Sequence, residues 1–179
     1  MIMSAGVRRA ALTTHVATSV GWLGAVAAFL ALAVVGKTSQ DAGVVRAAYL
    51  AMEVITWLVI VPLCLASLVT GLLQALFTRW GVFQYYWITT KLALTAIGTV
   101  ILLLKTRPIG VIAIAAAQRA LSGADLRALR NELIVHAAGG MVLLLVILIL
   151  SIYKPWGRTQ YGVRKFQKQR SLHSSVGIR

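Results

Sequence analysis

The stretch AALTTHVATSVGWLGAVAAFLALAVV, residues 10–35, is the first of four apolar runs that decide the fold of this 179-residue chain. The other three runs are Ala47–Phe77, Tyr86–Leu104 and Leu133–Tyr153. Each run reaches about the 20 residues that an α-helix needs to cross a hydrocarbon core roughly 30 Å thick. Because backbone amides in lipid must bond within their own segment, such runs predict helices rather than strands. The sequence therefore predicts an all-α polytopic membrane protein with a four-transmembrane-helix bundle.

The composition of the chain supports this prediction. Hydrophobic residues make up 59% of the chain and charged residues 12%, and the mean hydropathy is +0.84, which excludes an ordinary soluble domain. We expect a transmembrane domain over residues 1–154 and a basic cytoplasmic tail over residues 155–179. No glycine-rich phosphate loop occurs, and no serine, histidine and acid are placed to converge. A hydrolase or a nucleotide-dependent enzyme is therefore not predicted.

The distribution of basic residues predicts the orientation. Four spans put both termini on one side of the membrane, and eleven of the 18 lysines and arginines fall on that side. The positive-inside rule then places both termini in the cytoplasm. The tail should attract anionic lipid headgroups, and no nucleic-acid reader motif accompanies its charge. The seven basic residues on the opposite side are Lys37, Arg46, Lys105, Arg107, Arg119, Arg127 and Arg130.

Two prolines and the terminus predict local features of the helices. Pro62 lies inside the second run, where it should kink the helix and free a carbonyl near residue 58. Pro108 should end the third helix soon after Leu104. The weakly apolar segment Ile109–Leu121 is too short to span, so we expect it to form a short helix at the outer interface. Disorder is the expectation for the basic, polar tail after Pro155.

Four ionisable residues fall within or beside the apolar runs, and such residues mark candidate functional sites. The direction of each span places His15 and Lys91 near the cytoplasmic face, and Glu53 and His136 near the outer face. The outer pair could form an ion pair, a proton-handling pair or half of a metal site, and an interhelical hydrogen bond is the simplest interpretation. A haem clamped by His15 and His136 together is excluded, because most of the hydrocarbon core separates them.

The inner pole is the stronger candidate for a cofactor. Residues His15, Ser19 and Trp22 recur at positions i, i+4 and i+7, which puts a polar and aromatic stripe on one helix face. A neutral His15 imidazole can ligate haem iron, and Lys91 could pair with a haem propionate or an anionic quinone intermediate. The structural alternative is that His15 belongs to a polar helix start and that Lys91 extends to the headgroups.

These stretches resemble several four-helix bacterial membrane families. THVATSVGWLGAVAAFLALAV, residues 14–34, resembles the opening helix of an uncharacterised integral membrane family, of copper-resistance-type membrane proteins and of haem-binding membrane protoporphyrinogen oxidases. YYWITTKLALTAIGTVILLLK, residues 85–105, resembles the third helix of the oxidases. The uncharacterised family is the most similar in length, in residues 62–87 and in the KPWG ending at 154–157. The oxidase resemblance implies haem binding by His15 and Lys91, and the bacterial families imply the inner membrane.

Two functional hypotheses follow from these residues. The first is a small b-type, cytochrome-like redox protein with haem b held by His15, Lys91 and Trp22. The second is a non-catalytic accessory or scaffold subunit whose basic tail and interfacial segment dock a partner. The partner could be another membrane protein or a second copy of the chain. A proton-relaying transporter built on Glu53 and His136 is a third possibility, although four spans without an internal repeat fit alternating access poorly.

Overall fold

The computed structural model describes residues 4–77, 81–118 and 124–176. Within these ranges the chain is almost wholly helical, and four helical segments are long and apolar enough to cross a membrane. The predicted all-α architecture, with four helical segments able to span a membrane, is therefore confirmed. The helices are α1 (Ala5–Thr38), α2 (Ala42–Ile55), α3 (Val61–Phe77), α4 (Tyr86–Leu104), α5 (Thr106–Ala117), α6 (Ala124–Tyr153) and α7 (Gln160–Val176).

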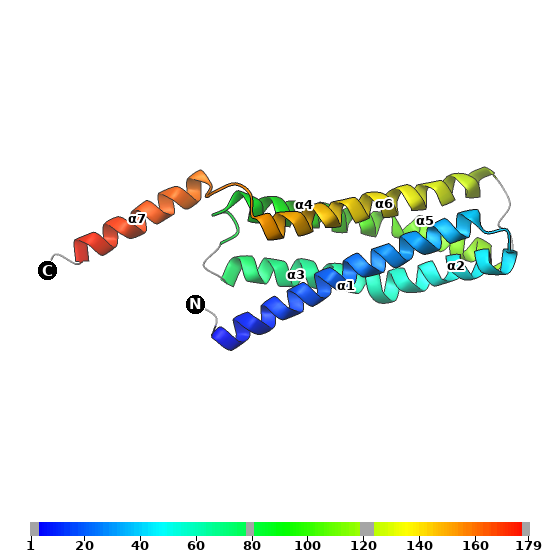
Figure 1. Cartoon of the computed structure of the whole chain (residues 1–179), viewed down its shortest axis with the longest axis horizontal. Helices are drawn as coiled ribbons and strands as arrows, with labels where there is room; N and C mark the ends of the chain where they lie inside the picture. The colour runs from blue at the N-terminus through cyan, green and yellow to red at the C-terminus, as the bar shows by residue number, and fades with distance from the viewer. Residues whose placement is uncertain (1–3, 78–80, 119–123, 177–179) are drawn as a thin grey trace.

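The helices assemble into four long rods. Helix α1 is the first rod, α2 and α3 form the second, α4 and α5 form the third, and α6 is the fourth. Helix α1 packs against α2, α3 and α6, and α4 packs against α3 and α6. The rods run side by side, and α1 begins at the same end of the bundle where α3 and α6 end (Figure 1). This arrangement is the one expected of consecutive antiparallel spans.

The second rod is irregular where Pro62 predicts it. A single π-helical turn, Thr56–Ile60, joins α2 to α3, and the Val61 amide bonds to the Thr56 carbonyl, five residues back. Proline has no amide hydrogen for the carbonyl four residues earlier, and a π-turn is a common way to absorb such a gap. The Thr56 hydroxyl donates to the Met52 carbonyl at 2.7 Å. Hydrogen bonds within the rod thus continue on the N-terminal side of Pro62.

The third rod differs from the sequence prediction in its second half. Helix α4 ends at Leu104, but after the single residue Lys105 the chain enters α5. Pro108 lies in the first turn of α5, where a missing amide hydrogen costs no intrahelical bond. Helix α5 buries Ile112 and Ala116 and packs along α2. The segment after Pro108 is therefore helical through Ala117 and continues the rod, and residues 119–121 of the predicted interfacial helix lie outside the described residues.

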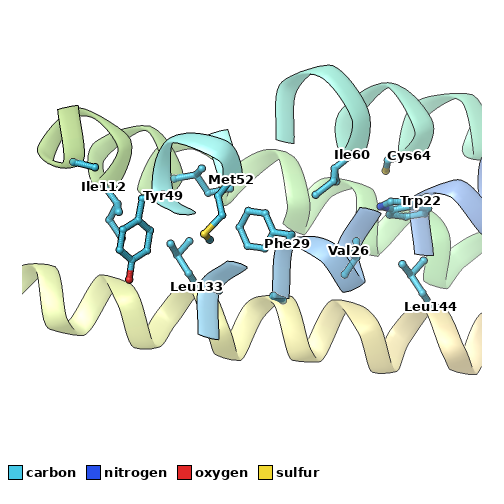
Figure 2. Packing of buried hydrophobic residues seen from close by; sticks show 14 of the residues in the cluster. Trp22, Val26, Phe29, Tyr49, Met52, Ile60, Cys64, Ile112, Leu133 and Leu144 are labelled. Carbon is cyan, nitrogen blue, oxygen red and sulfur yellow. The ribbon is translucent and has the colours of Figure 1, made fainter. Parts of the chain in front are cut away.

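The apolar core runs the length of the bundle. Figure 2 shows Tyr49, Met52 and Leu133 near one end of the core, and Trp22, Cys64 and Leu144 near the other. Many large apolar side chains face outward instead, among them Leu58 at 72% exposure and Val135 at 67%. Apolar surface on this scale would be a liability in water and is expected on a lipid-facing bundle.

Glycine allows the closest approach of α1 to α2. A Cβ atom at Gly36 would lie 2.8 Å from Cζ of the Tyr49 ring, closer than real Cβ contacts come. The turn between these helices is fixed by Asp41, whose carboxylate accepts from the amides of Gly43 at 2.7 Å and Val44 at 3.2 Å. This cap satisfies two of the free amides at the start of α2.

Candidate functional site

His15 is buried on the face of α1 that packs against α3. Its side chain is 9% exposed, and its Nδ1 atom lies 3.0 Å from the Thr70 hydroxyl oxygen. That hydroxyl already donates to the Ala66 carbonyl at 2.6 Å. The Thr70 oxygen must then accept, so Nδ1 carries the proton and the Nε2 lone pair stays available. The imidazole is held in one tautomer by α3.

The backbone of α3 is shaped for this ring. A Cβ atom at Gly71 would lie 3.0 Å from Cε1 of His15 and 3.8 Å from Nε2. Any larger residue at this position would push the imidazole away from α3. Glycine here therefore sets how closely α1 and α3 approach at the level of His15.

His15 is one member of a polar seam between α1 and α3. The Ser19 and Ser67 hydroxyls lie 2.7 Å apart, and Gln74 Nε2 donates to the Ala11 carbonyl at 2.9 Å. We call these contacts, together with the His15–Thr70 hydrogen bond, the α1–α3 seam. Sequence reasoning identified the half on α1 and missed the half on α3. The spacing of the polar residues 67, 70 and 74 on one helical face is the signal that could have found it.

Lys91 belongs to the same end of the bundle. It is half-buried in the second turn of α4. The hydroxyls beyond it form a ladder along α4, since Thr95 donates to the Lys91 carbonyl at 2.9 Å and Thr99 to the Thr95 carbonyl at 2.8 Å. Cys64 Sγ lies 3.1 Å from the Thr99 hydroxyl and ties this ladder to α3.

Trp22, the third predicted cofactor residue, lies deeper in the core. Its side chain is 5% exposed, and Nε1 has no hydrogen-bond partner in the described part of the chain. Figure 2 places it beside Cys64. A buried indole usually finds an acceptor, so this one marks a place where a polar atom of a ligand or a water could fit.

At the other end, the structure does not join Glu53 to His136. His136 Nδ1 pairs with the Glu132 carbonyl of its own helix at 2.7 Å, and Glu53 Oε1 lies 4.0 Å from where a Cβ at Gly110 would be. No hydrogen bond connects the two predicted partners within the described residues. The ion pair at this end is instead Lys105 with Glu132, at 2.7 Å between Nζ and Oε1.

The tail differs from the expected disorder, because residues after Pro155 form a short latch and then α7. The Thr159 amide donates to the Gln84 carbonyl at 3.0 Å and its hydroxyl donates to the Phe83 carbonyl. Arg158 forms an antiparallel bridge with Tyr85. A Cβ at Gly162 would clash with the Gln84 backbone, so only glycine fits there. We call these contacts between residues 83–85 and 158–162 the tail latch.

Helix α7 leads away from the bundle and is strongly basic. It extends beyond the end where α3 stops and α4 begins (Figure 1). The Arg158 guanidinium lies 4.0 Å from the centre of the Phe166 ring and so connects the latch to the second turn of α7. Four basic side chains of the helix are exposed: Arg164, Lys165, Lys168 and Arg170.

In the described ranges 4–77, 81–118 and 124–176, no three histidine, cysteine or acidic side chains come together as a metal-binding group. Comparisons of the chain with protein-family models, with curated proteins and with solved structures find no significant match. The candidate sites are therefore the α1–α3 seam with Lys91, and the latched helix α7.

Proposed function

We propose that this protein is a non-catalytic docking subunit of the bacterial cytoplasmic membrane, whose bundle presents α7 to a partner on the cytoplasmic side. The larger number of basic residues on the side of both termini supports this orientation. It also puts the half of the bundle that contains α5 at the outer face, where α5 meets the interface. The tail latch and α7 then lie at the cytoplasmic face of the membrane.

The observation that carries this proposal is the tail latch. A tail that only attracts lipid needs charge and no fixed direction. Here Thr159, Arg158 and Gly162 attach the start of α7 to the loop before α4 through hydrogen bonds, a bridge and a close backbone contact. Ordering these residues costs conformational entropy. A fixed direction is useful when α7 must meet a second surface at a defined angle.

The latch offers a sharp test in the native membrane. The wild-type protein, a variant lacking residues 160–179 and Gly162→Leu are extracted in mild detergent, and the mass of each native complex is measured. Leucine at 162 breaks the latch and leaves every charge of α7 in place. Gly157→Leu is the matched control, because a Cβ at Gly157 meets no atom within 4 Å.

We expect wild type and Gly157→Leu to share one complex heavier than the single chain. The truncated protein and Gly162→Leu should both lose it. A complex that survives truncation would overturn the proposal, and so would a wild-type protein that is monomeric under these conditions.

A second candidate function, haem binding, is favoured by the state of His15. Its Nδ1–H is already bonded to Thr70, which leaves Nε2 as the free ligand atom, and an oriented imidazole of this kind suits a haem axial ligand. Lys91 would pair with a propionate, and the orphaned Nε1 of Trp22 would face the bound group. A bound haem b would supply one-electron transfer. The protein would then be a small cytochrome-like redox protein.

Absorbance spectra decide this second candidate. We expect the purified protein, supplied with haem during expression, to show a Soret band and sharpened α and β bands after dithionite. His15→Ala should abolish these bands. His136→Ala, which changes the histidine that bonds within α6, should leave them unchanged. A wild-type spectrum without these bands would show that the protein binds no haem and that His15 has a packing role.

A further inference from the structure

We propose that α7 binds an acidic face of a protein in the aqueous phase, rather than the headgroups of the membrane that the bundle spans. This inference rests on the proposed docking function and names the chemistry of the partner. Three observations carry it: the charge of α7, its direction, and the contacts that fix that direction.

The charge of the tail has one sign. The chain has four acidic residues in all, and none follows Glu132, whereas seven lysines and arginines follow Tyr153. On α7, residues 164, 165 and 168 fall within an arc of about 100° at a helical period of 3.6 residues. We call Arg164, Lys165 and Lys168 the basic face. A face of this kind selects a partner with complementary negative charge and speeds the encounter.

The direction of α7 removes most of it from the reach of its own membrane. The helix has 17 residues and so measures about 25 Å. It starts beside the loop that precedes α4 and leads away from the end of the bundle (Figure 1). The attraction of anionic headgroups falls off within a Debye length, about 8 Å at physiological salt. The later turns of α7 are therefore presented to water and to what approaches from it.

The contacts around Phe166 keep α7 in this direction. Arg158 of the latch lies over one side of the Phe166 ring at 4.0 Å and Arg170 lies 5.7 Å from its centre. Stacking of an arginine side chain on an aromatic ring is favourable even at an exposed site. Together with the Gly162 contact to Gln84, this holds the first two turns against the bundle. Folding α7 back onto the bilayer would require these contacts to break.

The first experiment measures charge recognition on the full chain in nanodiscs of neutral phosphatidylcholine. The probe is a fluorescent deca-glutamate peptide, followed by anisotropy. The variant R164E/K165E/K168E reverses the charge of the basic face and should weaken binding of the peptide by about tenfold or more. Added salt should weaken binding of the peptide to the wild-type protein. The control is K37E/R107E/R127E, which reverses three exposed charges outside α7 and should leave binding within about twofold of wild type. Equal binding by wild type and the basic-face variant would overturn the inference.

A second measurement tests whether α7 contacts anionic lipid instead of a protein. A fluorophore on Ser174→Cys, near the end of α7, is read in nanodiscs that contain phosphatidylglycerol and a headgroup-attached quencher. We expect the emission to match that in neutral nanodiscs, because α7 points away from the lipid. Quenching that depends on phosphatidylglycerol would overturn the inference in favour of lipid. The docking function itself is tested separately by the native complex. If that complex survives removal of residues 160–179, the docking function is overturned, whether or not α7 binds the acidic peptide.

Discussion

The two halves of the bundle are held together by different interactions. The half that contains the α1–α3 seam uses hydroxyls, an imidazole and glycine, with His15 on Thr70 and Ser19 on Ser67. The half that contains α2 and α5 uses close apolar packing, with Met52 and Ile112 each 1% exposed. The difference predicts that substitutions in the two halves change the free energy of unfolding by different amounts.

The rods are longer than the membrane is thick. Helix α1 has 34 residues and so measures about 50 Å, against a hydrocarbon core of about 30 Å. About 20 Å of the bundle therefore extends beyond the lipid. In lipid, apolar burial gives helices no reason to associate, and small residues and hydrogen bonds take over. Large apolar side chains are exposed on both halves, among them Val69 and Val135, as expected of surfaces that face lipid. Tight side-chain packing around α2 and α5 and polar contacts in the α1–α3 seam are therefore two ways of holding helices together in lipid.

The largest expected effect on the free energy of unfolding comes from a cavity in the half that contains α2 and α5. Met52→Ala should lower the free energy of unfolding by about 2–5 kcal/mol, because Met52 is almost fully buried in the core. Thermal or denaturant unfolding in detergent measures it. Val54→Ala, at a side chain that is 55% exposed, is the control and should cost well under about 1 kcal/mol. Similar losses for both variants would show that burial does not decide the cost of shortening a side chain on α2.

A smaller effect is expected in the α1–α3 seam. Thr70→Val removes the acceptor of the His15 Nδ1–H and keeps the shape of the side chain. Interhelical hydrogen bonds within membranes average about 0.6 kcal/mol, so the coupling in a double-mutant cycle with His15→Ala should lie near that value. A coupling of several kcal/mol would show that the seam is stronger than membrane hydrogen bonds usually are. A coupling of zero would show that Thr70 does not hold the imidazole.

The sequence predicts the spans well and the side-chain partners poorly, for one physical reason. Lipid forces each apolar run into a helix, so hydropathy predicts the four rods, and Pro62 predicts the irregular turn. Hydropathy does not fix how a helix rotates about its own axis when all its faces are apolar. The rotation decides that His136 bonds to the Glu132 carbonyl rather than to Glu53.

The ordered structure of the tail was not predicted, for a different reason. A basic and polar segment cannot bury enough apolar surface to fold alone, which is why disorder is the expectation from composition. Helix α7 begins at contacts with Gln84 and Phe83, more than 70 residues earlier in the chain, as the separation of 76 residues between Thr159 and Phe83 illustrates. Composition within the tail carries no information about such partners.

The smallest expected change in the free energy of unfolding is at Tyr49, and there we expect an increase rather than a loss. Its ring packs against Gly36 and under Arg130, with 5.5 Å from the guanidinium to the ring centre, and its hydroxyl points toward α6 (Figure 2) without a hydrogen-bond partner among the described residues. Tyr49→Phe keeps the ring and the cation contact and removes only the buried hydroxyl. Because an unsatisfied buried polar group costs free energy, the variant should be more stable by about 0.5 kcal/mol. A loss of stability on unfolding in detergent would mean that the hydroxyl is bonded, through water or to α6, and that this half is less dry than its packing indicates.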